Sequence, residues 1–92
     1  MLPRHSHSKN TAKLSVTVTD LSGVQRVLTM LTGRNYALTY FAADEATAGR
    51  WRTTLDVILG ADQLDLLEAR LHRVPSVLDV EMRSSPELAA TA

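Results

Sequence analysis

The sequence predicts one α+β domain in which strands and helices follow one another in the order β-α-β-β-α-β. Three observations lead to this prediction: stretches where apolar and polar residues alternate, stretches where apolar residues recur at helical spacing, and turn-forming residues between them. A chain of 92 residues holds a single domain, because two independent hydrophobic cores do not fit in that length.

The first strand and the first helix are predicted around a short turn. Residues 13–19 alternate apolar and polar side chains, which is typical of a strand with one buried face. The turn at residues 20–23 follows, and the next stretch, as far as Gly33, carries apolar residues on one helix face. In the simplest interpretation Ser22 caps this helix, Gly23 makes the turn, and Gly33 closes the helix in the left-handed conformation. The unpaired N–H groups at such a helix start also suit an anion.

A hairpin is predicted next. Residues 36–43 have the pattern of a strand, residues 44–49 form a connecting loop, and residues 50–59 alternate again as a third strand. One face of the second strand is expected to carry Tyr36, Leu38 and Tyr40.

The last two elements complete the pattern. Gly60 ends the third strand, and residues 61–73 place leucines at helical spacing until Pro75 stops the helix. Residues 77–82 form the fourth strand. Right-handed crossovers then place both helices on one face of a four-stranded antiparallel sheet, the ferredoxin-like plait.

This topology leaves one sheet face and at least one edge strand uncovered. Pairing with a second copy is a common way to cover an edge, so we expect a homodimer. Residues 1–12 and 83–92 are expected to be a flexible arm and a flexible tail around a domain at residues 13–82. No apolar run approaches the ~20 residues of a membrane span, and the N-terminus lacks the apolar core of a secretory signal, which predicts a cytoplasmic protein without membrane contact.

The composition argues against several functions. Ten basic and ten acidic residues give a formal net charge of zero, whereas nucleic-acid binders usually carry a basic surplus. Plaits that bind RNA stack bases on aromatic residues of the central strands, and here only Trp51 is available, so an RNA-binding plait is a less favoured alternative. The chain contains no cysteine, which excludes disulfides and thiolate chemistry.

No pattern of catalytic residues is present in the sequence. His5 and His7 have no third metal ligand nearby, and Asp62 and Asp65 are explained by the first turn of a helix, where negative charge is favourable. A hydrolytic triad, a phosphate-binding glycine motif and a metal-ligand set are all missing. We therefore expect a non-enzymatic protein with no catalytic residues, no metal and no cofactor.

Four segments carry a resemblance to a known family. Residues 14–18, 22–28 and 34–38 together resemble the ACT domain, most closely the small regulatory subunits of acetolactate (acetohydroxyacid) synthase. Residues 71–80, a leucine and a basic pair followed by a Val-x-x-Val strand, are similar to the closing motif of those subunits. The resemblance covers about residues 13–82.

The resemblance implies a regulatory function. ACT domains pair through strand edges into one continuous sheet and bind an amino-acid effector at the interface, against the first strand–helix turn. The synthase small subunits also activate a large, thiamine-diphosphate-dependent catalytic subunit, so this chain would serve branched-chain amino-acid synthesis without catalysing a reaction. Carried over by position, the effector site comprises Asp20, Leu21, Ser22, Gly23, Val24, Ala37 and Leu38. In it Gly23 would lie against the ligand carboxylate, with the N–H groups of Ser22 and Val24 as donors.

Two positions depart from the valine-sensitive members. Those carry Asn where this chain has Asp20 and Ala37, so we expect a weak response to valine or none. The chain also ends soon after the ACT segment, as in the short, valine-insensitive small subunits. The alternative is a free-standing ACT sensor that binds another amino acid and regulates a different enzyme.

Overall fold

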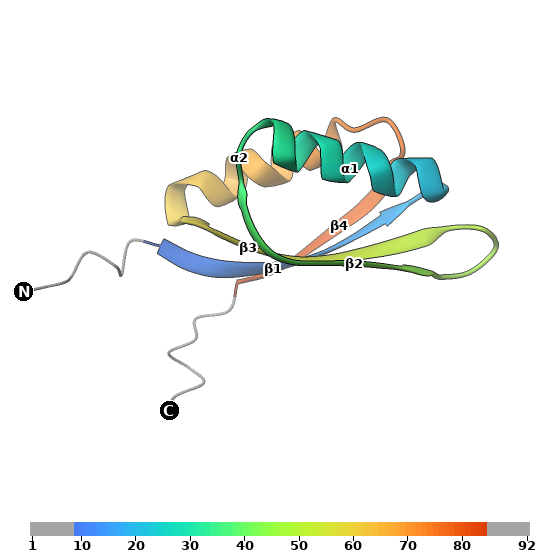
Figure 1. Ribbon diagram of the computed structural model, residues 1–92, viewed down its shortest axis with the longest axis horizontal. Helices are drawn as coiled ribbons and strands as arrows, with labels where there is room; N and C mark the ends of the chain where they lie inside the picture. Colours follow the sequence, from blue (N-terminus) through green and yellow to red (C-terminus); the bar gives the residue numbers. More distant parts are fainter. Residues whose placement is uncertain (1–8, 85–92) are drawn as a thin grey trace, which may run out of the picture.

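The computed structural model describes residues 9–84, which form a four-stranded antiparallel sheet with two helices on one face (Figure 1). The elements are β1 (Lys9–Val18), α1 (Leu21–Gly33), β2 (Ala37–Glu45), β3 (Trp51–Gly60), α2 (Ala61–His72) and β4 (Val77–Ser84). The strands lie in the order β2-β3-β1-β4, so β2 and β4 are the edges of the sheet. The predicted α+β plait and its order of elements are confirmed.

Both terminal strands extend further than the sequence predicts. β1 begins at Lys9 rather than at residue 13, because its antiparallel pairing with β3 continues along its whole length. β4 likewise runs on to Ser84. Residues 9–12 and 83–84, which were expected in the flexible ends, therefore belong to the sheet. The rest of the predicted arm and tail lies outside the described residues.

The core lies between the sheet and the helix layer and uses the alternate strand positions that the sequence predicts. Its fully buried apolar side chains are Leu14, Val16, Val18, Val27, Leu31, Leu55, Val57, Leu67 and Leu71. Thr53 shares the helix-facing side of β3, and within the described residues its buried hydroxyl has no hydrogen-bond partner. Burying this hydroxyl without a partner in an otherwise apolar core lowers the stability of the folded chain.

A bulge in β2 changes which side chains face the core. The register with β3 shifts between Leu38 and Tyr40, so Thr39 is an extra residue. Leu38 and Phe41 both pack against the core, whereas Tyr40 points to the open face of the sheet and is 52% exposed. The prediction that Tyr40 shares a face with Leu38 is therefore wrong, because strict alternation fails across a bulge.

The end of α1 also differs from the prediction. Gly33 stays within the helix, and the left-handed residue is Asn35, with φ of 59°. The Asn35 N–H donates to the Thr32 carbonyl (3.0 Å) and the Tyr36 N–H donates to the Leu31 carbonyl (3.1 Å), which is the Schellman pattern. Asparagine tolerates this conformation better than most residues, so the helix closes there without glycine.

Candidate functional site

The turn between β1 and α1 is closed by Asp20, which caps the helix. Its backbone is extended, and its carboxylate Oδ1 accepts hydrogen bonds from the Gly23 N–H (3.0 Å) and from the Ser22 hydroxyl (2.7 Å). The expectation that Ser22 is the cap is therefore wrong: Ser22 supports the capping residue. The hydrogen bonds from Ser22 and Gly23, with a smaller attraction from Arg26, lower the pKa of Asp20 below its ordinary value. Asp20 is therefore ionised at neutral pH.

This cap changes what the turn offers to a ligand. The positive end of α1 already has a carboxylate against it, and the Gly23 N–H, which lies between the Ser22 and Val24 N–H groups that the family resemblance assigns to a ligand, is already paired. A ligand carboxylate at this point would lie next to a like charge, whereas a ligand ammonium group would be attracted to Asp20. Asp20 and Ser22 are both exposed, so they can be reached from solvent.

Gly23 is required by close packing. A Cβ at this position would come within 2.7 Å of the Val18 Cβ and within 2.8 Å of the Ser76 Cβ. The Thr19 N–H also donates to the Ser76 carbonyl at 3.0 Å, so the end of β1, the start of α1 and the loop before β4 meet at one point. The turn is therefore closely packed against its neighbours, and glycine is needed because two other elements approach the helix start.

The other predicted site residues lie at the opposite end of the sheet. Ala37 pairs with Ile58, which pairs with Thr11 near the beginning of β1. The β1–α1 turn, by contrast, follows Val18 at the other end of that strand, about 23 Å away at the usual rise per residue. Within one chain, Ala37 and Leu38 are therefore not brought together with residues 20–24.

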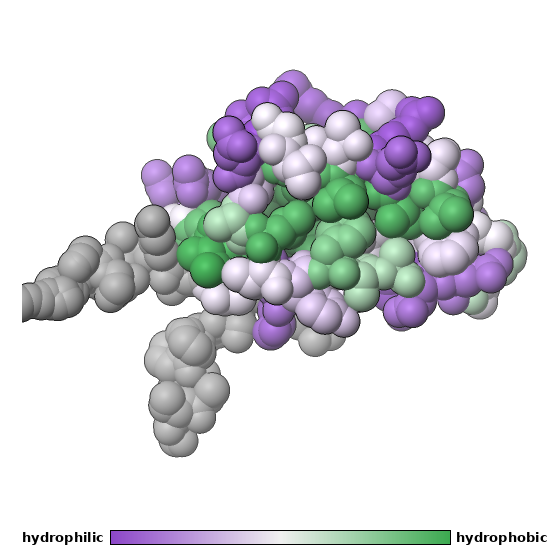
Figure 2. Space-filling model, viewed as in Figure 1, coloured by the Kyte–Doolittle hydropathy of each residue, from purple (hydrophilic) through white to green (hydrophobic). Residues whose placement is uncertain are grey.

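A hydrophobic band runs between the helix layer and the sheet on the side where α1 lies above edge strand β2 (Figure 2). On α1 it includes Leu21, which is 56% exposed, together with Val24 and Leu28. On β2 the half-buried Phe41 and Ala43 pack against the core below α1. Large apolar side chains next to an unpaired strand edge are typical of a surface that contacts another protein.

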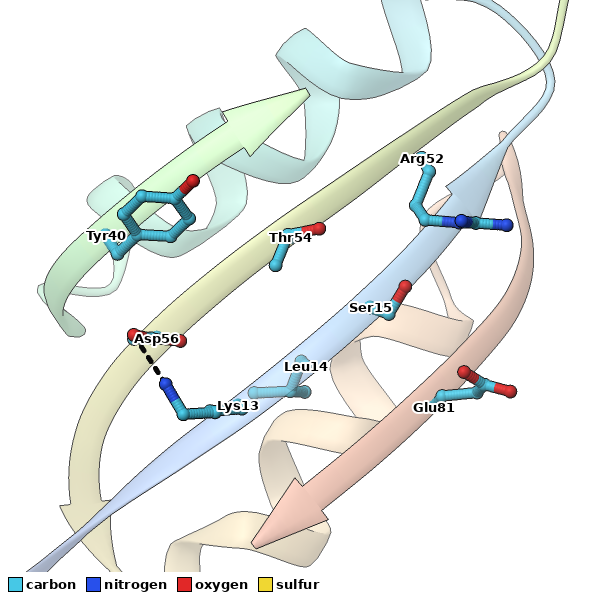
Figure 3. Close-up of a pocket in the computed structure, with 8 residues that line it drawn as sticks. All are labelled: Lys13, Leu14, Ser15, Tyr40, Arg52, Thr54, Asp56 and Glu81. Atoms are coloured by element: carbon cyan, nitrogen blue, oxygen red, sulfur yellow. Dashed lines mark hydrogen bonds and ion pairs between the residues drawn. The ribbon is translucent and has the colours of Figure 1, made fainter. Parts of the chain in front are cut away.

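The open face of the sheet carries a shallow hollow of about 610 Å³ (Figure 3). Its lining residues are Lys13, Leu14, Ser15, Tyr40, Arg52, Thr54, Asp56 and Glu81. The Lys13 ammonium and the Asp56 carboxylate form an ion pair of 3.1 Å across β1 and β3. The charges are mixed and partly paired, and the hollow offers no nucleophile next to a base, so it resembles a polar contact surface more than a catalytic site.

Two residues of these surfaces were not predicted from the sequence in these roles, Tyr40 on the open face of the sheet and Asp20 as the cap of α1. Tyr40 reaches the open face only because of the bulge at Thr39, which the alternation pattern does not signal. The role of Asp20 as cap could have been anticipated, since Asp is among the best N-cap residues. Within residues 9–84 no group of three or more potential metal ligands comes together, and no helix is long and apolar enough to cross a membrane.

Solved structures similar to this one identify the fold. The ACT domain of GTP pyrophosphokinase from Chlorobium tepidum superposes with a TM-score of 0.67 at 19% identity, covering 82% of this chain and 99% of that domain. The chain has the fold of an ACT domain. An uncharacterized protein from Thermotoga maritima gives a TM-score of 0.68 at 15% identity, covering 83% of this ACT-fold chain and 96% of that one.

The same fold occurs in proteins with other names. The C-terminal domain of the MgtC protein from Mycobacterium tuberculosis matches with a TM-score of 0.66 at 13% identity, covering 90% of this chain and 93% of that one. No protein-family model matches the sequence, and no curated protein matches it either. At 13–19% identity these likenesses establish the ACT-type fold of the chain and leave its function to be argued from its own surfaces.

Proposed function

We propose that this chain is a non-catalytic regulatory subunit that works as a homodimer paired through β2. The observation that carries the proposal is the hydrophobic band along the α1–β2 edge, on a domain with the ACT fold. We further propose that the regulated enzyme is the cytoplasmic catalytic subunit of acetolactate synthase in branched-chain amino-acid synthesis. That finer assignment is supported by the resemblance of residues 13–82 to the small subunits of the synthase.

Pairing of two β2 strands would complete the effector site. Glu45 pairs with Trp51, which pairs with Val18, so the end of β2 lies at the same end of the sheet as the β1–α1 turn. In an antiparallel β2–β2 dimer with its two-fold axis near Phe41, the start of one β2 lies beside the end of the other. Ala37 and Leu38 of one protomer would then approach residues 20–24 of its partner.

The chemistry of this composite site disfavours valine. Asp20 would attract the ammonium group of an amino acid, but its carboxylate already lies at the start of α1, where it would repel the ligand carboxylate. Ala37 offers no side-chain hydrogen bond from the other protomer. We therefore propose that the dimer activates its catalytic subunit with little or no inhibition by valine.

An activity assay tests the proposal. Acetolactate synthase catalytic subunit is measured alone, with this chain, and with this chain plus valine. We expect activation that valine leaves unchanged. Activation that valine reverses would show that Asp20 and Ala37 still build a valine site, and no activation would contradict the assignment to this enzyme.

A double variant tests the position of the effector site without involving the catalytic subunit. Asp20→Asn together with Ala37→Asn restores the residues that valine-sensitive subunits carry, so we expect valine affinity to rise by about tenfold or more. Isothermal titration of both proteins with valine measures this gain. If the variant gains no affinity, the site does not lie at residues 20–24 and Ala37.

A second candidate is a free-standing sensor of a different amino acid. It is favoured by Asp20, because an ionised carboxylate at the turn suits a ligand richer in positive charge than valine. A thermal-shift screen of the amino acids distinguishes the two candidates, since a ligand at a hundred times its dissociation constant stabilises the folded state by about 2.7 kcal/mol. Stabilisation by a basic amino acid, without activation of the synthase, would favour the sensor.

A further inference from the structure

A second surface of this chain lies between the two helices, on the side of the helix layer that faces away from the sheet. It is a groove of about 640 Å³ that is lined by apolar and basic side chains. Its lining residues are Arg26, Met30, Arg34, Leu66, Ala69, Arg70, Arg73, Val74 and Pro75. Neither the predicted dimer edge at β2 nor the β1–α1 turn accounts for this groove.

The groove is lined by one stripe from each helix. Arg26 and Met30 of α1 and Arg34, which caps its C-terminal end, follow one another at four-residue steps. On α2 the lining positions are 66, 69 and 70, and the C-cap at position 73 continues the same helix face. Leu66 is 48% exposed although it is a large apolar side chain. Each stripe thus combines a large apolar residue with two arginines.

The charge of the groove is strongly one-sided. Four of the ten basic residues of this electrically neutral chain line it, and no acidic residue does. Within residues 9–84, none of these four guanidinium groups has a carboxylate within 4.0 Å; the ion pairs found there are Lys13–Asp56 and His72–Glu68. Arginine stays charged at every physiological pH, so the groove is permanently cationic.

One of the arginines is held in place. Arg70 Nη1 donates a hydrogen bond of 2.9 Å to the Tyr36 hydroxyl, which follows the end of α1. The guanidinium group is therefore directed across the gap between the helices before any partner binds. An ordered arginine loses less side-chain entropy when it pairs with a carboxylate.

The shape of the groove favours a helix over a small anion. Arg26 and Arg34 are about 12 Å apart along α1 at the usual helical rise, and two further arginines stand on the other wall. Arginines spread along two helices match carboxylates along the sides of a partner helix better than they match one compact phosphate. The apolar side chains of the groove, among them Met30 and Leu66, fit side chains at i, i+3, i+4 and i+7 of that helix.

We propose that the α1–α2 groove binds an acidic amphipathic helix of a partner protein, with apolar residues toward Met30 and Leu66 and carboxylates toward the four arginines. Permanent positive charge next to apolar side chains gives both the attraction and the buried area that such a contact needs. The proposal does not depend on an amino-acid effector or on the identity of the regulated enzyme.

The test uses a fluorescein-labelled synthetic helix of about 18 residues, long enough to be partly helical when free. It carries Leu at i, i+3, i+4 and i+7 and Glu at the flanking positions, and a control peptide carries Lys in place of Glu. Fluorescence anisotropy measures binding to the whole chain at low and at high salt. We expect only the acidic peptide to bind, and binding to weaken as salt rises.

Two double variants with the same change of charge locate the binding. Arg34→Glu with Arg73→Glu is expected to lower the affinity for the acidic peptide by about tenfold or more and to create affinity for the Lys peptide. Arg50→Glu with Arg52→Glu, outside the groove, should keep the affinity within roughly twofold of the wild type. Circular dichroism verifies that both variants are folded. Sedimentation that is the same for the variants and the wild type verifies that the groove is separate from the dimer edge.

Three results would overturn the proposal. The first is equal loss of binding in both double variants, or no binding by the wild-type chain. The second is binding of inorganic phosphate alone that displaces the peptide and depends on Arg34 and Arg73, which would identify a small-anion site. The third is self-association of the wild-type chain that Arg34→Glu with Arg73→Glu abolishes, which would identify a second copy as the occupant.

Discussion

The two flanks of α1 differ in chemistry although they belong to the same helix. The flank toward β2 presents Leu21, Val24 and Leu28 and no charged residue, whereas the flank toward α2 presents Arg26 and Arg34 around Met30. An apolar strip beside a strand edge suits a second copy of the same chain, because the strand supplies hydrogen bonds and the strip supplies buried area. A cationic groove suits a different, acidic partner. One helix can thus serve two interfaces.

The largest expected effect is on dimerisation, from a substitution on the flank of α1 that faces β2. Leu21→Asp should raise the dissociation constant of the homodimer by about 100-fold or more, because it places a charge in the apolar band. The fold should tolerate it, since Leu21 is 56% exposed and an acidic residue suits the first turn of α1. Analytical ultracentrifugation measures the change.

Leu66→Asp is the matched control on the other flank. Leu66 is 48% exposed and lies in the α1–α2 groove, so its replacement should leave the dimer intact while weakening binding of the acidic helix. If both variants dissociate the dimer equally, or neither does, the assignment of the α1–β2 edge as the dimer interface is wrong.

Gly23→Ala should disturb both flanks together. The added methyl group would meet Val18 and Ser76 at less than 3.0 Å, so the start of α1 must shift, at a cost of about 1–3 kcal/mol in the free energy of unfolding. Gly33→Ala is the control, because a Cβ there meets nothing within 4 Å and alanine favours the helix by about 0.5–1 kcal/mol. Equal denaturation midpoints for the two variants would contradict the packing role of Gly23.

A change in the core beneath α1 should affect neither flank. Thr53→Val replaces a buried hydroxyl that lacks a partner by a methyl group of similar size, which should raise the free energy of unfolding by about 1 kcal/mol. Dimerisation and peptide binding should stay as in the wild type. A lower stability in urea denaturation would mean that the hydroxyl is hydrogen-bonded in solution.

The smallest effect concerns the capping carboxylate and its dependence on pH. The pKa of Asp20 is lower in the folded chain than its ordinary value, so the ionised group stabilises the fold above the unfolded pKa of about 3.9. This contribution is lost as the pH falls through the lowered folded value. Asp20→Asn keeps a capping side chain without the charge, so its stability should differ from the wild type at pH 7 and converge with it in acid. A difference that stays constant with pH would show that the charge plays no part.

Much of this architecture follows from the sequence because hydrophobic periodicity is a local signal. The alternation in residues 13–19 and 50–59 and the leucine spacing in α2 predict the core face of each element. The bulge at Thr39 was missed because it depends on how β2 and β3 align, and Asn35 was missed because Gly33 is the more common helix terminator.

The functional surfaces were less predictable for a related reason. Residues 20–24 and Ala37 were grouped by resemblance, and only the sheet register shows that within one chain they lie at opposite ends of the sheet. The arginines of α1 and α2 can each be seen in the sequence, but whether they face a common groove depends on how two distant helices pack. Periodicity within an element says nothing of its neighbours.

Cross-linking by single cysteines in this cysteine-free chain tests the β2-paired dimer most directly. With the two-fold axis near Phe41, position 40 of one protomer lies opposite position 42 of the other, at a distance that a disulfide can bridge. We expect a mixture of Tyr40→Cys and Ala42→Cys chains to form a covalent dimer on mild oxidation, while Leu78→Cys on the other edge strand, β4, stays monomeric in denaturing gels. Cross-linking through Leu78→Cys without any through β2 would contradict the β2-paired dimer.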